Sequence, residues 1–173
     1  MKDIAGEALL FDMYYAAVDP IPAAGEKRDA PKVQLLPVTA ETPSFKNFYI
    51  SNVVADGAKK AIFIRGLPEM NINNIFLENM TLQAEKGIEI EEAKEIHFKD
   101  VTVISQDTKP VVNIVNSSSL FFNNLKYSEG AGLLFNINGE KNSNISVVNT
   151  NVAKAAEKAE FNAGAKSQSL IIK

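Results

Sequence analysis

A short motif built around Asn or Asp recurs along this chain, and it constrains the fold more than any other feature. Its five anchors, spaced by 27, 21, 24 and 25 residues, are Asn52, Asn79, Asp100, Asn124 and Asn149. Apolar residues stand four and two positions before each anchor, and the apolar alternation resumes one and three positions after it. A period of two predicts a strand with one buried face. The change of phase predicts a bend at the anchor, where Asn adopts left-handed backbone easily.

A second apolar pair follows nine to twelve residues after each anchor. We expect these pairs to be Ile62/Ile64, Ile88/Ile90, Val112/Ile114, Leu133/Phe135 and Ala159/Phe161. Each unit then holds about three short strands, which bury their apolar faces only when successive units stack about 4.8 Å apart. The repeat therefore predicts an all-β fold, a parallel β-helix, with six or seven coils. A β-sandwich would need hairpin dipeptides, and only Asp56-Gly57 and Asn138-Gly139 come close to that pattern.

The composition narrows the classes of function. With 46% hydrophobic and 23% charged residues, residues 1–173 are expected to form a single domain. A net charge of −3 without basic clusters argues against a nucleic-acid partner. No apolar run reaches the length of a membrane span. The lack of cysteine excludes thiolate metal sites, and the lone His97 has no ligand at metal spacing, so neither a metal nor a cofactor is predicted.

Two segments interrupt the repeat. Residues 16–44 contain five of the seven prolines, which predicts a long loop inserted into an early coil. Residues 152–165 are rich in Ala, Lys and Glu, and by propensity alone they could form a short helix. The apolar residues 170–172 restore the repeat after this segment.

Four stretches carry a family resemblance. AIFIRGLPEM (residues 61–70) and INNIFLENMT (72–81) closely resemble the late coils of bacterial polygalacturonase-like enzymes, glycoside hydrolase family 28, and residues 1–15 and 41–50 resemble segments just upstream. The resemblance implies a right-handed parallel β-helix of the pectin lyase-like type. It covers only the C-terminal part of a family member, since a full member is more than twice as long. The resemblance therefore implies a solenoid truncated at its N-terminal end.

The family's catalytic motifs are missing from this chain. Members carry an Asn-Thr-Asp segment, an Asp-Asp pair, a Gly-His-Gly turn and an Arg-Ile-Lys strand for inverting hydrolysis, all upstream of the region matched here, and none occurs in this sequence. No catalytic residue is predicted. The resemblance implies the C-terminal coils of a glycosidase that hydrolyses galacturonate-containing polysaccharide, inactive as this chain alone. The alternative is a non-catalytic β-helix that serves as a carbohydrate-binding or interaction scaffold.

One family site falls inside the matched region. A tyrosine after the strand matched by residues 9–11 helps to form the sugar-binding cleft, and the resemblance assigns this place to Tyr15, with Tyr14 beside it. The implied ligand is pectic polysaccharide. An aromatic ring offers a flat face and a hydroxyl to a sugar. The other interpretation is that both rings pack at the base of the long loop.

The remaining candidates have simpler interpretations. Glu89, which alternates with apolar residues, and the two acids that follow at 91 and 92 are expected to form an exposed acidic patch. Lys59, Lys60 and Arg65 could meet an anionic polysaccharide, although solvated charge on the outside of a solenoid explains them more simply. Asn71, Asn73, Asn74 and Asn79 are expected to hydrogen-bond from coil to coil. His97 is expected on the outer face.

The ends of a solenoid are chemically exposed. An open first coil presents unpaired strand edges and apolar core, which normally require a cap. We expect this end to be covered by a second copy in a homo-oligomer, by residues 16–44, or by a further domain. The family's members are usually exported, and no apolar signal segment follows Met1, so a targeting signal would precede the sequence considered.

Overall fold

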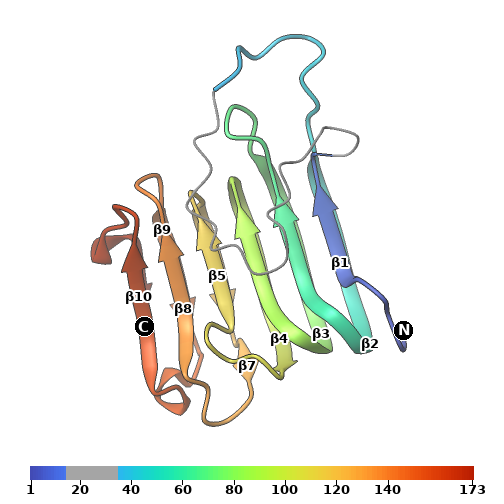
Figure 1. Ribbon diagram of the computed structural model, residues 1–173, viewed down its shortest axis with the longest axis vertical. Coiled ribbons are helices and arrows are strands. Elements are labelled where there is room, and N and C mark those ends of the chain that lie inside the picture. Colours follow the sequence, from blue (N-terminus) through green and yellow to red (C-terminus); the bar gives the residue numbers. More distant parts are fainter. Residues whose placement is uncertain (15–34) are drawn as a thin grey trace.

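The chain folds into a parallel β-solenoid of about five turns, in a computed structural model that describes residues 1–14 and 35–173 (Figure 1). All strand pairs described are parallel. The strands are β1 (Glu7–Asp12), β2 (Lys46–Arg65), β3 (Ile72–Glu91), β4 (Ala93–Ser105), β5 (Val112–Val115), β6 (Ser118–Asn123), β7 (Lys126–Tyr127), β8 (Leu133–Asn138), β9 (Ser143–Val148), β10 (Glu157–Asn162) and β11 (Leu170–Ile172). Two 3-10 turns, Val152–Lys154 and Ser167–Ser169, lie between the last strands.

Each turn of the solenoid contributes to three faces. The first face holds the segments before the anchors: the start of β2, then β3, β4, β6, β9 and β11 in succession. The second face holds the segments after the anchors in β2, β3 and β4, followed by β7. The third face stacks β1, the end of β2, the end of β3, β5, β8 and β10. Segments about 25 residues apart therefore become neighbours, as the repeat predicted.

The bends occur where the anchors predicted them. All five anchors have left-handed backbone, with φ between 53° and 60°. A second left-handed corner lies five residues before each anchor, at Asn47, Asn74, Glu95, Ser119 and Asn144. These second corners include Glu and Ser, which rarely adopt this conformation, so residue type alone did not reveal them.

Asparagine side chains connect successive coils, as expected for Asn71, Asn74 and Asn79, whereas Asn73 donates to the Asn71 carbonyl within its own coil. Asn79 Nδ2 donates to Asn52 Oδ1 at 2.6 Å, and Asn74 Nδ2 donates to Asn47 Oδ1 at the same distance. On the third face Asn136 donates to Asn113 at 3.0 Å. In each of these bonds the amide of one coil donates to the coil before it, so the ladders have a direction along the solenoid axis.

The inward residues of the three faces form one continuous core. Its fully buried members include three phenylalanines: Phe98 stacks on Phe122 with ring centroids 4.7 Å apart, and Phe122 meets Phe135 edge to face at 5.3 Å. The core of the first turn is less well covered, since Phe48, Ile50 and the neighbouring apolar side chains remain partly exposed.

Two expectations require correction. In β8 the inward pair is Phe135/Ile137, which stands opposite Val112/Ile114, and not Leu133/Phe135. Leu133, Leu134 and Phe135 are all buried, so local hydrophobicity left the register ambiguous, and pairing with β5 decides it. The estimate of six or seven coils was too high because residues 35–45 lie outside any strand and the terminal coils are partial.

The segment 152–165 contains no α-helix. It forms a short 3-10 turn and then β10, which pairs with β8 and continues the third face. Tertiary pairing therefore overrides the helical propensity of its alanines and lysines. Of the inserted loop predicted at 16–44, residues 16–34 lie outside the described part, and residues 35–44 contain no strand. Among the residues described, no helix is long and apolar enough to span a membrane.

Candidate functional site

The outer side of the third face brings together charged side chains from distant parts of the sequence. β1 pairs with the end of β2, which places Asp12 directly opposite Arg65. The Arg65 guanidinium donates from Nε to Asp12 Oδ1 at 3.0 Å and from a terminal nitrogen to Oδ2 at 2.6 Å. Only 8% of Arg65 is exposed. This bidentate pair stabilises the junction between the first two turns, because a planar guanidinium matches a carboxylate in both charge and shape.

Tyr14 covers this ion pair. The Arg65 guanidinium carbon lies 4.6 Å from the centre of the Tyr14 ring, and the Tyr14 backbone N–H donates to Asp12 Oδ1 at 3.0 Å. Burial raises the pKa of the Tyr14 hydroxyl, an effect that the nearby Arg65 charge partly opposes. The hydroxyl therefore stays protonated at neutral pH and can donate a hydrogen bond. Tyr15, the other residue of the predicted sugar site, lies outside the described residues.

An apolar hollow of about 390 Å³ adjoins Tyr14. Met13 and Tyr14 line one part of it, Leu67 and Glu69 another, and residues of the segment 36–43 complete the lining. Tyr14 thus stands at the described end of the inserted segment, and it touches both the ion pair and this hollow. Both predicted roles of Tyr14, packing and ligand binding, are consistent with this position.

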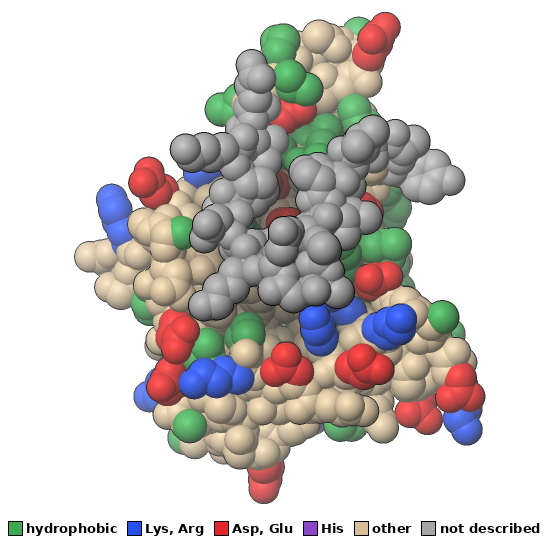
Figure 2. Space-filling model, in the orientation of Figure 1, with side chains coloured by type: hydrophobic (Ala, Val, Ile, Leu, Met, Phe, Trp, Pro, Cys, Tyr) green, Lys and Arg blue, Asp and Glu red, His purple; other side chains and the backbone are tan. Residues whose placement is uncertain are grey.

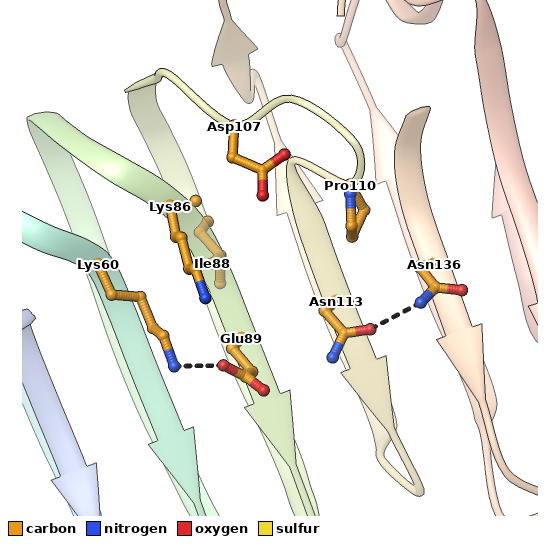
Figure 3. Close-up of a pocket in the computed structure, with 9 residues that line it drawn as sticks. Lys60, Lys86, Ile88, Glu89, Asp107, Pro110, Asn113 and Asn136 are labelled. Atoms are coloured by element: carbon orange, nitrogen blue, oxygen red, sulfur yellow. Dashed lines mark hydrogen bonds and ion pairs between the residues drawn. The ribbon is translucent and has the colours of Figure 1, made fainter. Parts of the chain in front are cut away.

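A second hollow, of about 260 Å³, lies further along the same face (Figure 3). Its lining side chains come from β2, β3, β5 and β8 and from the loop between β4 and β5. Basic Lys60 and Lys86, acidic Glu89 and Asp107, and the amides of Asn113 and Asn136 lie around it, with Gly87, Ile88 and Pro110. Lys60 and Glu89 form an ion pair, and the Lys60 ammonium lies 3.9 Å from the centre of the Phe63 ring.

This hollow offers hydrogen-bond donors to a polar, anionic ligand. Lys86 is exposed and makes no ion pair with any described residue, so its ammonium is available to a carboxylate. Asn113 Oδ1 accepts from Asn136 and Asn138, and Asn136 Oδ1 accepts from Asn162. The Asn113 Nδ2 is therefore the amide donor that these two asparagines leave for a ligand. Figure 2 shows basic and acidic side chains next to one another on this side of the molecule.

The structure corrects the predicted environment of the charged residues. Glu89 and Glu92 are half-buried instead of forming an exposed patch: Lys60 pairs with Glu89, while Asn116 donates to Glu92 at 2.8 Å. Arg65 and Lys60 are the basic partners in ion pairs with Asp12 and Glu89. Of the three predicted basic residues only Lys59 is exposed. Each partner is supplied by a neighbouring coil, and a reading of the local sequence could not identify it.

The outer side of the first face carries a ladder of stacked rings that was not predicted from the sequence. On the outer side of the first face, Tyr49, Phe76, His97 and Phe121 stack in a continuous ladder, with centroids 4.4 to 4.6 Å apart and planes within 15° of parallel. The prediction that His97 lies on the outer face is confirmed. A signal for the ladder was present, because each of its residues stands three positions before an anchor, between the two inward apolar residues.

His97 gives the ladder a dependence on pH. Burial between Phe76 and Phe121 lowers the pKa of His97 below its usual value of 6.5, although Glu95 partly opposes this. Because the pKa of His97 is lower in the folded protein than in the unfolded chain, His97 binds a proton more readily when the chain is unfolded. Its contribution to stability is therefore complete above pH 6.5 and declines as the pH falls toward the folded-state pKa.

We expect His97→Phe to remove this dependence while keeping the stack. The difference in thermal midpoint between the variant and the wild type should grow in favour of the variant from pH 7.5 to pH 5. Thermal unfolding followed by circular dichroism at several pH values measures it. Lys126→Gln, on the second face away from the ladder, serves as the control. A constant difference between His97→Phe and the wild type would contradict the assignment.

Among the residues that the structure describes, no group of three or more His, Asp and Glu is arranged to hold a metal ion. Comparison of the chain with models of known protein families, with curated proteins and with solved structures finds no match. The fold is therefore established by the strand pairing alone, and the function has to be argued from the faces just described.

Proposed function

We propose that this chain binds an acidic polysaccharide of the pectin class along the outer side of its third face. The observation that carries the proposal is the hollow in which the Lys86 ammonium stands beside the Asn113 and Asn136 amides. A galacturonate unit presents one carboxylate and several hydroxyls, and their oxygens can accept from the Lys86 ammonium and from the Asn113 Nδ2. Tyr14 lies on the same face and offers a ring and a hydroxyl for a further sugar unit.

The resemblance of residues 61–81 to polygalacturonase-like enzymes supports the same class of ligand. On this proposal the chain forms the C-terminal coils of such a glycosidase, and other coils supply the carboxylates that hydrolyse the glycosidic bond. The chain alone binds without hydrolysis. Inverting hydrolysis needs one carboxylic acid and one carboxylate free to activate water, whereas Asp12 and Glu89 are held in ion pairs.

Titration of the chain with galacturonate oligomers, followed by calorimetry at low salt, tests the proposal. We expect binding that the variant Lys86→Glu weakens about tenfold, because the reversed charge repels the carboxylate. The control is Lys126→Glu, which makes the same change of charge on the second face. Recognition of the carboxylate at this hollow is refuted if fully methyl-esterified oligomers bind as tightly as the charged oligomers. It is also refuted if Lys86→Glu and Lys126→Glu lose the same affinity.

The second candidate, a non-catalytic β-helix scaffold, is favoured by the ion pairs that occupy these carboxylates. Release of reducing sugar from polygalacturonate separates the two possibilities. We expect none from this chain, and galacturonate binding by the chain alone would be sufficient for a scaffold. Measurable release would show that this chain carries a complete catalytic pair.

A further inference from the structure

The aromatic ladder on the first face stops at Phe121, where the next coil has a small side chain. β9 follows β6 in this stack, and Ser146 pairs with Phe121 in the row of the ladder. The residue after Ser146 in the same row is Ile171 of β11. His97 covers one face of the Phe121 ring, and the other face is turned toward Ser146. Phe121 remains 39% exposed and Ile171 47% exposed, so the row has a gap between two apolar side chains.

The gap at Ser146 has the thickness of one ring. Ring centroids in the ladder lie 4.4 to 4.6 Å apart, with planes within 15° of parallel. Neighbouring strands lie about 4.8 Å apart, so Phe121 and Ile171, which are two strands apart, leave about one strand spacing on each side of an inserted ring. A flat ring above Ser146 contacts the Phe121 face on one side and the Ile171 side chain on the other.

Two hydrogen-bonding groups border this gap. Ser146 Oγ makes no hydrogen bond to any described residue. Asn123, two residues after Phe121, lies on the same outer side because side chains alternate along a strand. Its Oδ1 accepts from Asn149 Nδ2 at 2.8 Å, whereas its own Nδ2 has no acceptor among the described residues. One hydroxyl and one amide donor therefore remain for a ligand.

The two strands that form the floor of the gap are uncharged. β6 and β9 contain no Asp, Glu, Lys or Arg, in contrast to β4, which contains four such residues. Lys173, directly after β11, is exposed. A charged ligand would lose hydration in the gap without a counter-charge on β6 or β9, whereas an uncharged polar ligand does not pay this penalty.

We propose that the gap at Ser146 binds an uncharged sugar, with one pyranose ring stacked on Phe121. A pyranose presents a face of C–H groups, whose partial positive charge packs well on the negative face of an aromatic ring. Its hydroxyls accept from Asn123 Nδ2 and exchange hydrogen bonds with Ser146 Oγ. A planar aromatic ligand fills the same thickness but brings few groups for these two partners. This site lies on a different face from the galacturonate hollow and does not depend on it.

Titration with uncharged oligosaccharides, followed by NMR of the backbone amides, tests the proposal. The probes are linear hexamers of β-linked glucose, galactose and mannose. We expect at least one of them to shift the amide signals of Phe121 and Ser146, with about millimolar affinity because a single stacked ring buries little area. The affinity should be the same at low and high salt, since no ion pair forms.

Two variants locate the bound ring. Phe121→Ala removes the stacking face and should weaken binding about tenfold. Ser146→Phe adds a ring to the ladder in the place of the sugar, so it should abolish binding while the thermal midpoint stays the same or rises. Phe76→Ala is the control, because it removes the same atoms from the ladder at a position away from the gap. It should bind the hexamer like the wild type.

Several results would overturn the proposal: no binding of any of the three hexamers, equal losses in Phe121→Ala and Phe76→Ala, or binding by a folded Ser146→Phe. Tighter binding of indole than of any hexamer, with the same shifts, would assign the gap to aromatic ligands instead.

Lys86→Glu separates this site from the third face. It should leave the affinity for the uncharged hexamers unchanged, and a loss equal to that of Phe121→Ala would place the sugar in the galacturonate hollow and overturn the proposal. Hexamer binding without any galacturonate binding would refute only the function proposed for the third face.

Discussion

Replacing Phe122 by alanine is expected to lower the free energy of unfolding by about 3–5 kcal/mol. Phe122 is fully buried on β6, where it stacks on Phe98 of the preceding turn and meets Phe135 edge to face. A parallel solenoid closes its core with one layer of side chains per turn, so neighbouring turns have little freedom to collapse into the cavity. Denaturant unfolding at equilibrium measures the loss.

The neighbouring residue provides the control. Phe121 lies on the same strand but points outward, where it stacks on His97 and is 39% exposed. Phe121→Ala removes the same atoms without leaving a buried cavity, and we expect it to cost about 1 kcal/mol. Similar losses in the two variants would mean that the inward and outward assignments of this strand, and hence its register, are wrong.

Gly87→Ala is expected to produce the second large effect, a loss of about 3 kcal/mol or failure to fold. Gly87 lies in β3, where a Cβ atom would stand 1.9 Å from the Val111 carbonyl oxygen of the next turn. That oxygen accepts the backbone hydrogen bond from Ile88 at 2.9 Å. Any side chain at position 87 must therefore push two turns apart at the point where the third face is paired.

A matched glycine separates this contact from the general effect of replacing glycine. Gly6 has no heavy atom within 4 Å of an added Cβ and no left-handed backbone, so Gly6→Ala should leave the thermal midpoint unchanged or raise it slightly. Thermal unfolding of both variants and the wild type makes the comparison. A Gly87→Ala variant as stable as the wild type would show that β3 and β5 lie further apart than the structure places them.

Much of the fold could be predicted because the residues within each repeat unit indicate its strands and bends. Apolar residues flanking each anchor predicted the strands, and the Asn or Asp anchors predicted the left-handed bends. The prediction was wrong where three apolar residues follow one another, at Leu133, Leu134 and Phe135, because alternation is then lost and only the neighbouring turn selects the inward pair.

The candidate site was less predictable. The resemblance pointed to Tyr15, which lies outside the described residues, with Tyr14 beside it. Arg65 was expected in solvent and instead lies under Tyr14, paired with Asp12, which is 53 residues away in sequence. The hollow around Lys86 draws side chains from four strands and a loop. Coil lengths vary between 21 and 27 residues, so counting along the sequence does not show which residues share a row.

The sequence by itself therefore determined the strands, the bends at the anchors and the stacking of coils, since these depend on period-two hydrophobicity and on the backbone preferences of Asn and Asp. The tertiary structure decided which outward side chains meet: Arg65 with Asp12, Lys60 with Glu89, and the ladder from Tyr49 to Phe121. The physical reason is that alternation separates inward from outward positions but does not show which outward residues become neighbours. Their partners are set by the register between coils, which the packing of the inward side chains imposes.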